Sequence, residues 1–210
     1  MMEKGVLIIL SGFSGAGKDT VIKKLMSKYD NYALSISATT RAPRVGETEG
    51  VSYFYKTVEE FEQMIKEDKL YEYAQFVGNY YGTPKDYVNE QLELGKDVIL
   101  EIELQGARIV KEKNPEVVTI FVTPPDAKSL KERLIGRGTE DMATINARLR
   151  RATEEAQYMD EYDYLLINDD LDICVEELHT LIKSQHFSVN RNIKKINHIR
   201  EGVKAFSEGE

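Results

Sequence analysis

The segment that most constrains the fold is a glycine-rich loop between a predicted strand and a predicted helix. Residues 12–20 read Gly-Phe-Ser-Gly-Ala-Gly-Lys-Asp-Thr and directly follow the apolar run at 5–10. Gly12 and the pair Gly17-Lys18 have the spacing of a phosphate-binding loop, whose glycines let the backbone wrap around an anion. The following helix adds its positive end, and Lys18 supplies a charge for the outer phosphates. We therefore predict that the chain binds a nucleoside triphosphate.

One position of this loop departs from the usual pattern. The residue after Lys18 is normally Ser or Thr, whose hydroxyl contacts magnesium, but here it is Asp19, followed by Thr20. Three arrangements stay open: Thr20 serves instead, Asp19 holds the ion through water, or other carboxylates do. A chance match to the loop pattern is disfavoured by the strand before it and the helix after it.

Length and charge exclude several classes of protein. A chain of 210 residues is long enough for one domain with a substantial core. Its net charge of −8 argues against a general nucleic-acid binder, and no apolar stretch approaches a membrane span. The short N-terminal segment lacks the features of a signal peptide, and the single Cys174 permits no internal disulfide. We expect a cytoplasmic protein without a nucleic-acid or membrane partner, in which Cys174 is a core residue.

Short apolar runs alternate with helical patterns along most of the chain. Because these runs are continuous rather than alternating, they predict a parallel sheet covered by helices on both faces, an α/β fold whose sites lie at the carboxyl ends of the strands. The predicted strands are 6–10, 33–37, 98–102, 117–122 and 164–167. The predicted helices are 20–28, 84–94, 105–111, 126–135, 144–159 and 171–185.

Two segments break this alternation. Residues 38–83 combine aromatic runs with a short helical stretch at 58–66, which predicts a small mixed β insert on the rim of the core, where a second substrate is often carried. Beyond residue 188 the chain becomes basic and carries an apolar helical stripe, composed of Ile193, Ile196, Ile199, Val203 and Phe206. We expect this C-terminal helix to dock on its own domain; a subunit contact and then a membrane surface are the alternatives.

Two arginines follow the second predicted strand. Arg41 and Arg44 flank Pro43, and guanidinium forks match phosphate oxygens two at a time. Ser37 and Tyr53 add hydroxyl donors nearby. The segment suits the phosphate of a nucleoside monophosphate, and the alternative is a solvated surface loop.

The insert and the third core strand each contribute carboxylates. Glu72 lies close in sequence to Tyr81 and Thr83, and a carboxylate is the natural acceptor for the paired N–H donors of guanine. On the sequence alone, a glutamate in such a position is more often a surface residue. Glu101 and Glu103 end a buried strand, where acids need a partner or a cation. Glu101 suits magnesium and Glu103 the acceptor base; alternatively both lie in solvent beyond the strand.

Four arginines surround the glycine-containing loop at 136–140. Arginines on a closing loop neutralise the charge that spreads over a transferred phosphoryl group. We favour this role for Arg137 and Arg148, whereas Arg133 and Arg151 are equally compatible with helix-surface ion pairs. The run from Asn168 to Asp170 follows the last strand, where helix capping is expected and a contact with the donor base is an additional option.

Taken in order, these motifs resemble guanylate kinases over about residues 5–185. The matching runs are Ser-Gly-Phe-Ser-Gly-Ala-Gly-Lys, Thr-Thr-Arg-Ala-Pro-Arg-Val-Gly-Glu, Gly-Val-Ser-Tyr-Phe, Phe-Val-Gly-Asn-Tyr-Tyr-Gly-Thr, Glu-Ile-Glu-Leu-Gln-Gly-Ala, Arg-Gly-Thr-Glu and Asn-Asp-Asp. Phe13 stands where the family usually has Pro, Asp19 is the less usual choice, and the segment after 188 extends past the usual end of the domain. A single phosphate loop would specify no particular kinase, whereas the ordered set does.

The resemblance implies magnesium-dependent transfer of a phosphoryl group from ATP to GMP by a monomer or small homo-oligomer. It implies a core of the P-loop NTPase type, an acceptor-binding insert at about 37–90 and a helical lid at about 137–150. The implied catalytic residues are Lys18, Arg41, Arg137 and Arg148. The implied ATP contacts are Gly12, Phe13, Ser14, Gly15, Ala16, Gly17, Lys18, Asp19, Thr20 and Asn168, the last toward adenine.

The resemblance also assigns the acceptor and the metal. For the GMP phosphate it implies Ser37, Arg41, Arg44, Tyr53 and Tyr81, and for guanine it implies Glu72, Thr83 and Glu103. For magnesium it implies Glu101, with Asp19 and Thr20 as further candidates. Two other functions remain open: a kinase with a different small-molecule acceptor, and a phosphopeptide-binding module of the same fold, which typically lacks an intact phosphate loop.

Overall fold

The five predicted core strands form one parallel sheet in the computed structural model, which describes residues 4–136, 138 and 141–207. Their order across the sheet is β2-β7-β1-β8-β9, so β1 lies at the centre, between β7 and β8. The predicted α/β class is therefore confirmed. The bounds are β1 Leu7–Gly12, β2 Tyr32–Leu34, β7 Asp97–Glu101, β8 Val118–Thr123 and β9 Tyr164–Ile167.

Helices cover both faces of this sheet, which explains why its strands read as continuous apolar runs. Ile8 and Leu10 of β1 pack into one core with α1 and α7, while Ile9 packs into a second core with α3 and α4. All three side chains are 0% exposed. Cys174 is buried in the first core, as predicted. The helix bounds are α1 Lys18–Lys28, α3 Lys85–Glu93, α4 Leu104–Lys113 and α7 Leu171–Gln185.

The segment that breaks the alternation folds as a separate mixed sheet, as predicted. Its order is β4-β3-β6-β5, with β3 and β4 parallel and the other pairs antiparallel. Phe61 of α2 packs with Ala38 and Leu70 in a small core of its own. The bounds are β3 Ala38–Thr39, β4 Phe54–Tyr55, α2 Val58–Lys66, β5 Leu70–Phe76 and β6 Asn79–Pro84.

The strand predicted at 33–37 is shorter in the structure. It ends at Leu34, because the chain leaves the core sheet there and enters the second sheet at Ala38. The carbonyl of Ser37 accepts a hydrogen bond from the N–H of Phe54, at 2.9 Å. Ser37 therefore lies in the connection between the two sheets.

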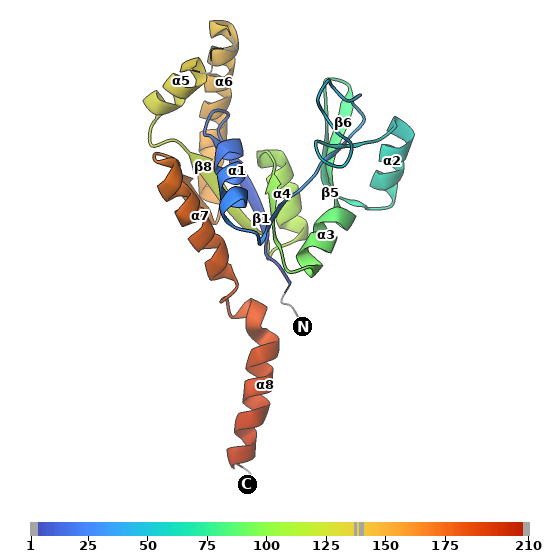
Figure 1. Ribbon diagram of the computed structural model, residues 1–210, viewed down its shortest axis with the longest axis vertical. Coiled ribbons are helices and arrows are strands. Elements are labelled where there is room, and N and C mark those ends of the chain that lie inside the picture. The colour runs from blue at the N-terminus through green and yellow to red at the C-terminus, as the bar shows by residue number, and fades with distance from the viewer. Residues whose placement is uncertain (1–3, 137, 139–140, 208–210) are drawn as a thin grey trace.

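Two further helices rise above the carboxyl ends of the core strands, across from the second sheet (Figure 1). They are α5, Ala127–Gly136, and α6, Met142–Glu155. The helix predicted at 144–159 ends early: after Glu155 the chain tightens into a 3₁₀ turn, η1, at Ala156–Glu161. Arg137 and residues 139–140 of the predicted lid lie outside the described residues.

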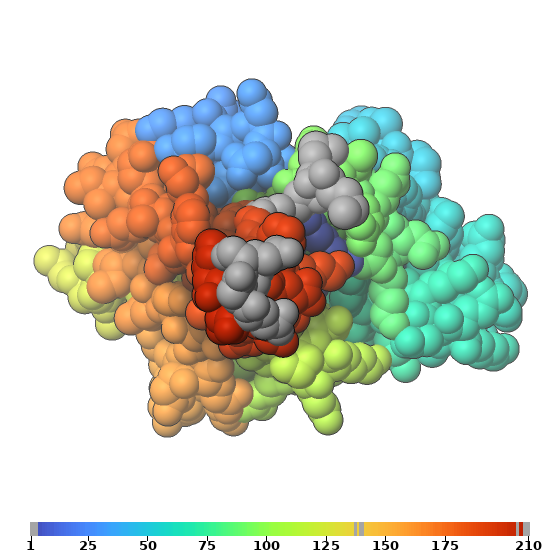
Figure 2. All heavy atoms as spheres, turned by 90° about the horizontal axis from the view of Figure 1, so that it is seen from below, coloured from blue at the N-terminus to red at the C-terminus, as the bar shows by residue number. Residues whose placement is uncertain are grey.

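The C-terminal helix α8, Ile193–Lys204, lies between the short turns η2, Asn190–Asn192, and η3, Ala205–Ser207. It points away from the rest of the chain, and the view along it shows the second sheet on one side and α6–α7 on the other (Figures 1 and 2). Ile199 is 61% and Phe206 79% exposed, so the predicted docking of this stripe on its own domain is not found. At the base of α8, Arg191 of η2 donates to the carbonyl of Gly5 at 2.8 Å. Within the described part of the chain, none of the helices combines the length and apolar character needed to cross a bilayer.

Candidate active site

The glycine-rich loop between β1 and α1 has the backbone geometry of an anion cradle. Gly12 and Gly17 have φ of 150° and 89°. A Cβ at Gly12 would lie 2.1 Å from the carbonyl oxygen of Val122, and one at Gly17 would lie 2.6 Å from Nδ2 of Asn168. Because neither position has room for a side chain, the predicted glycine pattern reflects steric need as well as backbone freedom.

The loop is held from outside by two side chains. Asn168, which is 6% exposed, donates from Nδ2 to the carbonyl of Ala16 at 2.8 Å. Arg133 of α5 donates from Nη2 to the carbonyl of Asn168 at 2.7 Å, with Nη1 3.5 Å from the carbonyl of Ala16. Asn168 thus fixes the loop backbone in this structure, while its contact with the donor base stays a prediction. Arg133 braces the same loop rather than forming a surface ion pair.

Phe13, the unusual residue of the loop, anchors it to the core. Its ring is 8% exposed and meets the ring of Phe121 edge-on, with centroids 5.0 Å apart. Phe121 in turn meets Tyr162 edge-on at 5.2 Å. The backbone donor at position 13 is kept, and the aromatic side chain ties the loop to β8.

Cations gather around this loop. The Lys18 ammonium donates to the carbonyl of Gly12 at 2.9 Å, which places it over the loop. Arg148 of α6 donates from Nη1 to the hydroxyl of Ser14. The side chains of Lys18, Arg148 and Ser14 line a cavity of about 440 Å³. Glu101 and Glu103 line the same cavity. The structure therefore brings together the predicted donor-phosphate residues that it describes.

Glu101 and Asp19 face the same space from β7 and α1. Burial and the nearby Asp19 carboxylate raise the pKa of Glu101 to about 7, against the opposing effect of Lys18. Two neighbouring carboxylates repel each other when both are charged, and a hard divalent cation between them would relieve this repulsion. Magnesium is usually bound by one or two carboxylates, with water and substrate phosphates as its other ligands. Thr20 is exposed on α1. Among the described residues, no group of three or more acidic, His or Cys side chains is arranged as a metal site.

The predicted acceptor-phosphate residues cluster on the second sheet. The Arg41 guanidinium lies 5.3 Å from the centroid of the Tyr53 ring, whose centroid is 6.2 Å from that of Tyr81. Arg41 also donates from Nη2 to Oε1 of Glu47 at 2.8 Å. The other Glu47 oxygen accepts from the N–H of Arg44 and from the Tyr55 hydroxyl, at 2.7 and 2.8 Å.

Glu47 is a site residue that the sequence analysis did not single out. Its hydrogen bond to Arg41, followed by that to the Arg44 backbone, lowers the pKa of Glu47 to about 2. The carboxylate therefore stays charged and holds both predicted arginine positions. The spacing of Arg41, Arg44 and Glu47 at intervals of three was the available signal, and only the fold shows that these residues meet.

Glu72 and Thr83 form the predicted pair on neighbouring strands. The Thr83 hydroxyl, which is 0% exposed, donates to Oε1 of Glu72 at 2.7 Å. Burial raises the pKa of Glu72, partly offset by the hydrogen bonds from Thr83. Glu72 is therefore not the solvated surface glutamate of the alternative interpretation.

Glu103, the third predicted guanine contact, is the N-cap residue of α4. It is exposed, and it pairs with Arg151 of α6, which also bonds Glu155 at 3.0 Å. Arg151 thus forms the ion pairs that the sequence left open, one of them to a predicted guanine contact. Of the two strand-end acids, Glu101 is half-buried and Glu103 lies beyond the strand.

Comparison with known proteins identifies the family of this site. Residues 4–185 match the family model described as guanylate kinase. A guanylate kinase of Lactococcus lactis is 48% identical over 97% of this chain and 100% of its own length. One of Oceanobacillus iheyensis is 53% identical over 95% and 97%. A solved guanylate kinase structure from Anaplasma phagocytophilum superposes with a TM-score of 0.69 at 30% identity, covering 90% of each chain.

Proposed function

The chain belongs to the guanylate kinase family, and from this premise we propose that it transfers the terminal phosphoryl group of ATP to GMP, giving ADP and GDP. The observation that carries the choice of acceptor is the half-buried Glu72 carboxylate held by Thr83. Guanine presents N1–H and its amino group on one edge, and a carboxylate accepts both. Adenine has no such pair of donors and would leave the carboxylate unpaired, which disfavours it strongly.

The donor phosphates are assigned to the loop at 12–20. Its N–H groups and the N-terminus of α1 bind the phosphates, and Lys18 contacts the outer ones. Arg148 approaches the loop from α6 at Ser14, and together with Arg137 it is proposed to neutralise charge on the transferring group. Asn168 is proposed to contact adenine with the part of its side chain that faces away from Ala16.

The acceptor phosphate is assigned to the aromatic and arginine cluster of the second sheet. Arg41 and Arg44 bind its oxygens, with hydroxyl groups from Tyr53, Tyr81 and Ser37. Glu47 holds Arg41 and the Arg44 backbone, so the guanidinium position is fixed before the phosphate arrives. Such preorganisation saves the cost of ordering the side chain on binding.

Magnesium is proposed to bind ATP at the Glu101 and Asp19 carboxylates, with Thr20 as a further candidate. When bound, the ion neutralises phosphate charge and orients the phosphates. The protein's own residues do the rest: they align donor and acceptor in line and exclude water, which would otherwise take the phosphoryl group. We propose that the insert at about 37–90 and the lid at about 137–150 close over the two nucleotides for this purpose.

The experiment that tests this function measures ADP formation from ATP and magnesium, with GMP, AMP, CMP and UMP offered separately. Fast turnover with GMP alone is expected. Turnover with a different monophosphate would keep the kinase and refute the role of Glu72, whereas a lack of turnover with all four would refute the reaction.

A further inference from the structure

The carboxylate of Glu72 is bounded on its second side by a helix of the core. Oε1 accepts from Thr83, as described, while Oε2 faces Gly106 in the first turn of α4. A Cβ built at Gly106 would lie 3.2 Å from Oε2, 3.3 Å from Cγ and 3.4 Å from Cδ of Glu72. The side chain therefore occupies a slot between β6 and α4, and residue 106 forms one of its walls.

The backbone at Gly106 does not itself call for glycine. Gly106 lies in a helix, and its φ is not in the positive range that only glycine adopts readily. Glycine is a poor helix former, so its presence in a first turn needs a different reason. The close approach of Glu72 supplies one.

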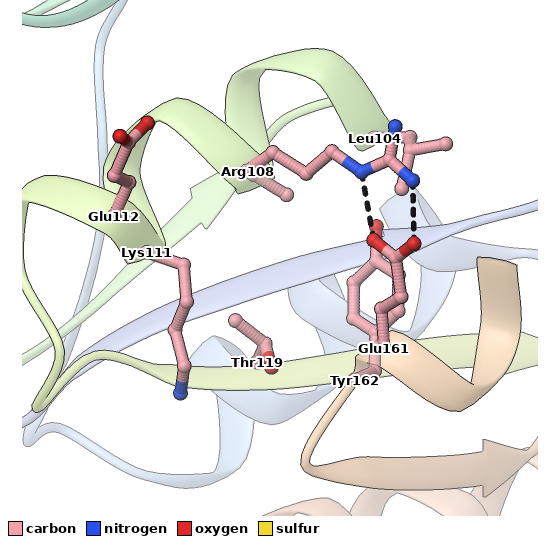
Figure 3. Close-up of a pocket in the computed structure, with 8 residues that line it drawn as sticks. Leu104, Arg108, Lys111, Glu112, Thr119, Glu161 and Tyr162 are labelled. Atoms are coloured by element: carbon pink, nitrogen blue, oxygen red, sulfur yellow. Dashed lines mark hydrogen bonds and ion pairs between the residues drawn. The ribbon is translucent and has the colours of Figure 1, made fainter.

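The helix that carries Gly106 has little freedom to move away. Ala107 and Val110 are buried at 4% and 0% exposure against the sheet. On the same helix Arg108 pairs with Glu161, Nε to Oε2 at 2.7 Å (Figure 3). Lys111 donates to the carbonyl of Val117 at 2.8 Å. These contacts fix α4 to the core sheet, to the residue that precedes β8 and to η1.

Glu72 is the side that would yield to a larger residue at position 106. Its carboxylate is attached through rotatable bonds, and Thr83 holds it by a hydrogen bond. A displacement of a few tenths of an ångström at its Cδ and Oε2 would strain the Thr83 hydrogen bond and turn the carboxylate from its present plane.

We propose that Gly106 is a specificity-determining position: the absence of a side chain there sets the plane and depth of the Glu72 carboxylate that recognises the acceptor base. Gly106 acts through Glu72 and is a positioning residue. This inference rests on the proposed function, because it assigns to Glu72 the two N–H donors of guanine. It adds that a core helix, and not the insert alone, determines how the base is read.

The test is Gly106→Ala in the full chain, assayed with ATP and with GMP or IMP as acceptor. IMP lacks the amino group that guanine presents to the second carboxylate oxygen. We expect KM for GMP to rise roughly tenfold, because small misplacements of binding groups have large effects. We expect KM for ATP to stay unchanged, and the preference for GMP over IMP to shrink. A general loss of helix stability would not alter this ratio.

Two further variants keep the inference falsifiable. Glu72→Asp withdraws the carboxylate by one methylene and should remove the clash, so Gly106→Ala should add little in that background, a non-additive double-mutant cycle. Gly202→Ala, in α8 with no atom within 4 Å of the added Cβ, is the matched control and should leave all parameters unchanged.

The outcomes separate this inference from the function on which it rests. If the unmodified protein fails to phosphorylate GMP, the proposed function and the role of Gly106 fall together. If it is active and Gly106→Ala leaves both the KM for GMP and the GMP-to-IMP ratio unchanged, only the role of Gly106 is refuted. Additive effects of Gly106→Ala and Glu72→Asp would likewise refute it.

Discussion

Replacing Asn168 by Ala tests whether the phosphate-binding loop is held from outside. The Asn168 amide is 6% exposed and donates to the carbonyl of Ala16, which is itself 0% exposed. In Asn168→Ala that carbonyl loses its 2.8 Å hydrogen bond and retains the long contact from Arg133. The Arg133 Nη1, at 3.5 Å, is too distant to replace it without movement.

The size of the effect follows from this geometry. A buried acceptor left without a hydrogen bond costs about 1–3 kcal/mol, so we expect Asn168→Ala to lower the free energy of unfolding by that amount. Asn168→Asp has the same shape but presents an oxygen to the Ala16 carbonyl. At neutral pH, Asn168→Asp places a buried negative charge beside a carbonyl oxygen. Its free energy of unfolding should therefore fall further than that of Asn168→Ala.

Two measurements check the prediction: urea unfolding for stability and calorimetry for the dissociation constant of ATP. Both variants should bind ATP several-fold more weakly, since the loop that supplies the N–H groups loses its support. Asp169→Asn, an exposed neighbour, is the control and should match the unmodified protein. Losses below about 0.5 kcal/mol, the range of ordinary surface changes, together with unchanged ATP binding, would refute the bracing role.

Three other predictions concern the donor, the acceptor and the buried acid. Lys18→Ala should remain folded by circular dichroism and lose most of its turnover; near-normal turnover would contradict the donor site. Arg41→Ala should weaken GMP binding in calorimetry and leave ATP binding intact, and the reverse would exchange the two sites. Burial raises the pKa of Glu72, so the folded state binds its proton more tightly and stability falls as pH rises through the carboxyl range. Glu72→Gln should therefore melt higher than the unmodified protein at about pH 8, match it at about pH 4 and bind GMP weakly; equal melting temperatures at both pH values would contradict the burial argument.

The core could be predicted because its elements follow from local pattern. Strand β9 and helices α2 and α7 begin and end where the sequence placed them. The two helices have N-caps, Thr57 and Asp170, whose side chains accept from first-turn N–H groups. The core strands could be predicted as well, because strands that are buried on both faces have continuous apolar sequences.

The errors arose where tertiary contacts decide the outcome. The strand predicted to reach Ser37 ends at Leu34 because the chain crosses to the second sheet. The apolar stripe around Ile199 specified a helix and not its direction, nor the contact at its base between Arg191 and the Gly5 carbonyl. Periodicity carries no information on a contact between residues so far apart in the sequence.

The sequence named candidate site residues by their chemistry, but it did not reveal which of them brace the phosphate-binding loop. Arg41 carries a charge that a phosphate needs, which a sequence reveals. Asn168 and Arg133 instead bond backbone carbonyls, and many residue types in many places do the same. Their role follows only from where β9 and α5 bring them.

If the second sheet binds the acceptor phosphate as proposed, the supporting residues also prepare that site for a highly charged ligand. Glu47 uses both carboxylate oxygens on the acceptor cluster, one toward the Arg41 guanidinium and one toward the Arg44 N–H and the Tyr55 hydroxyl. With its pKa lowered to about 2, it remains a fixed anion at any working pH. A phosphate that binds Arg41 therefore meets a guanidinium already oriented and partly neutralised. Glu47 cancels part of the electrostatic attraction between Arg41 and the phosphate. In return, the N–H groups of the guanidinium are already in position and need no rearrangement at the moment of transfer.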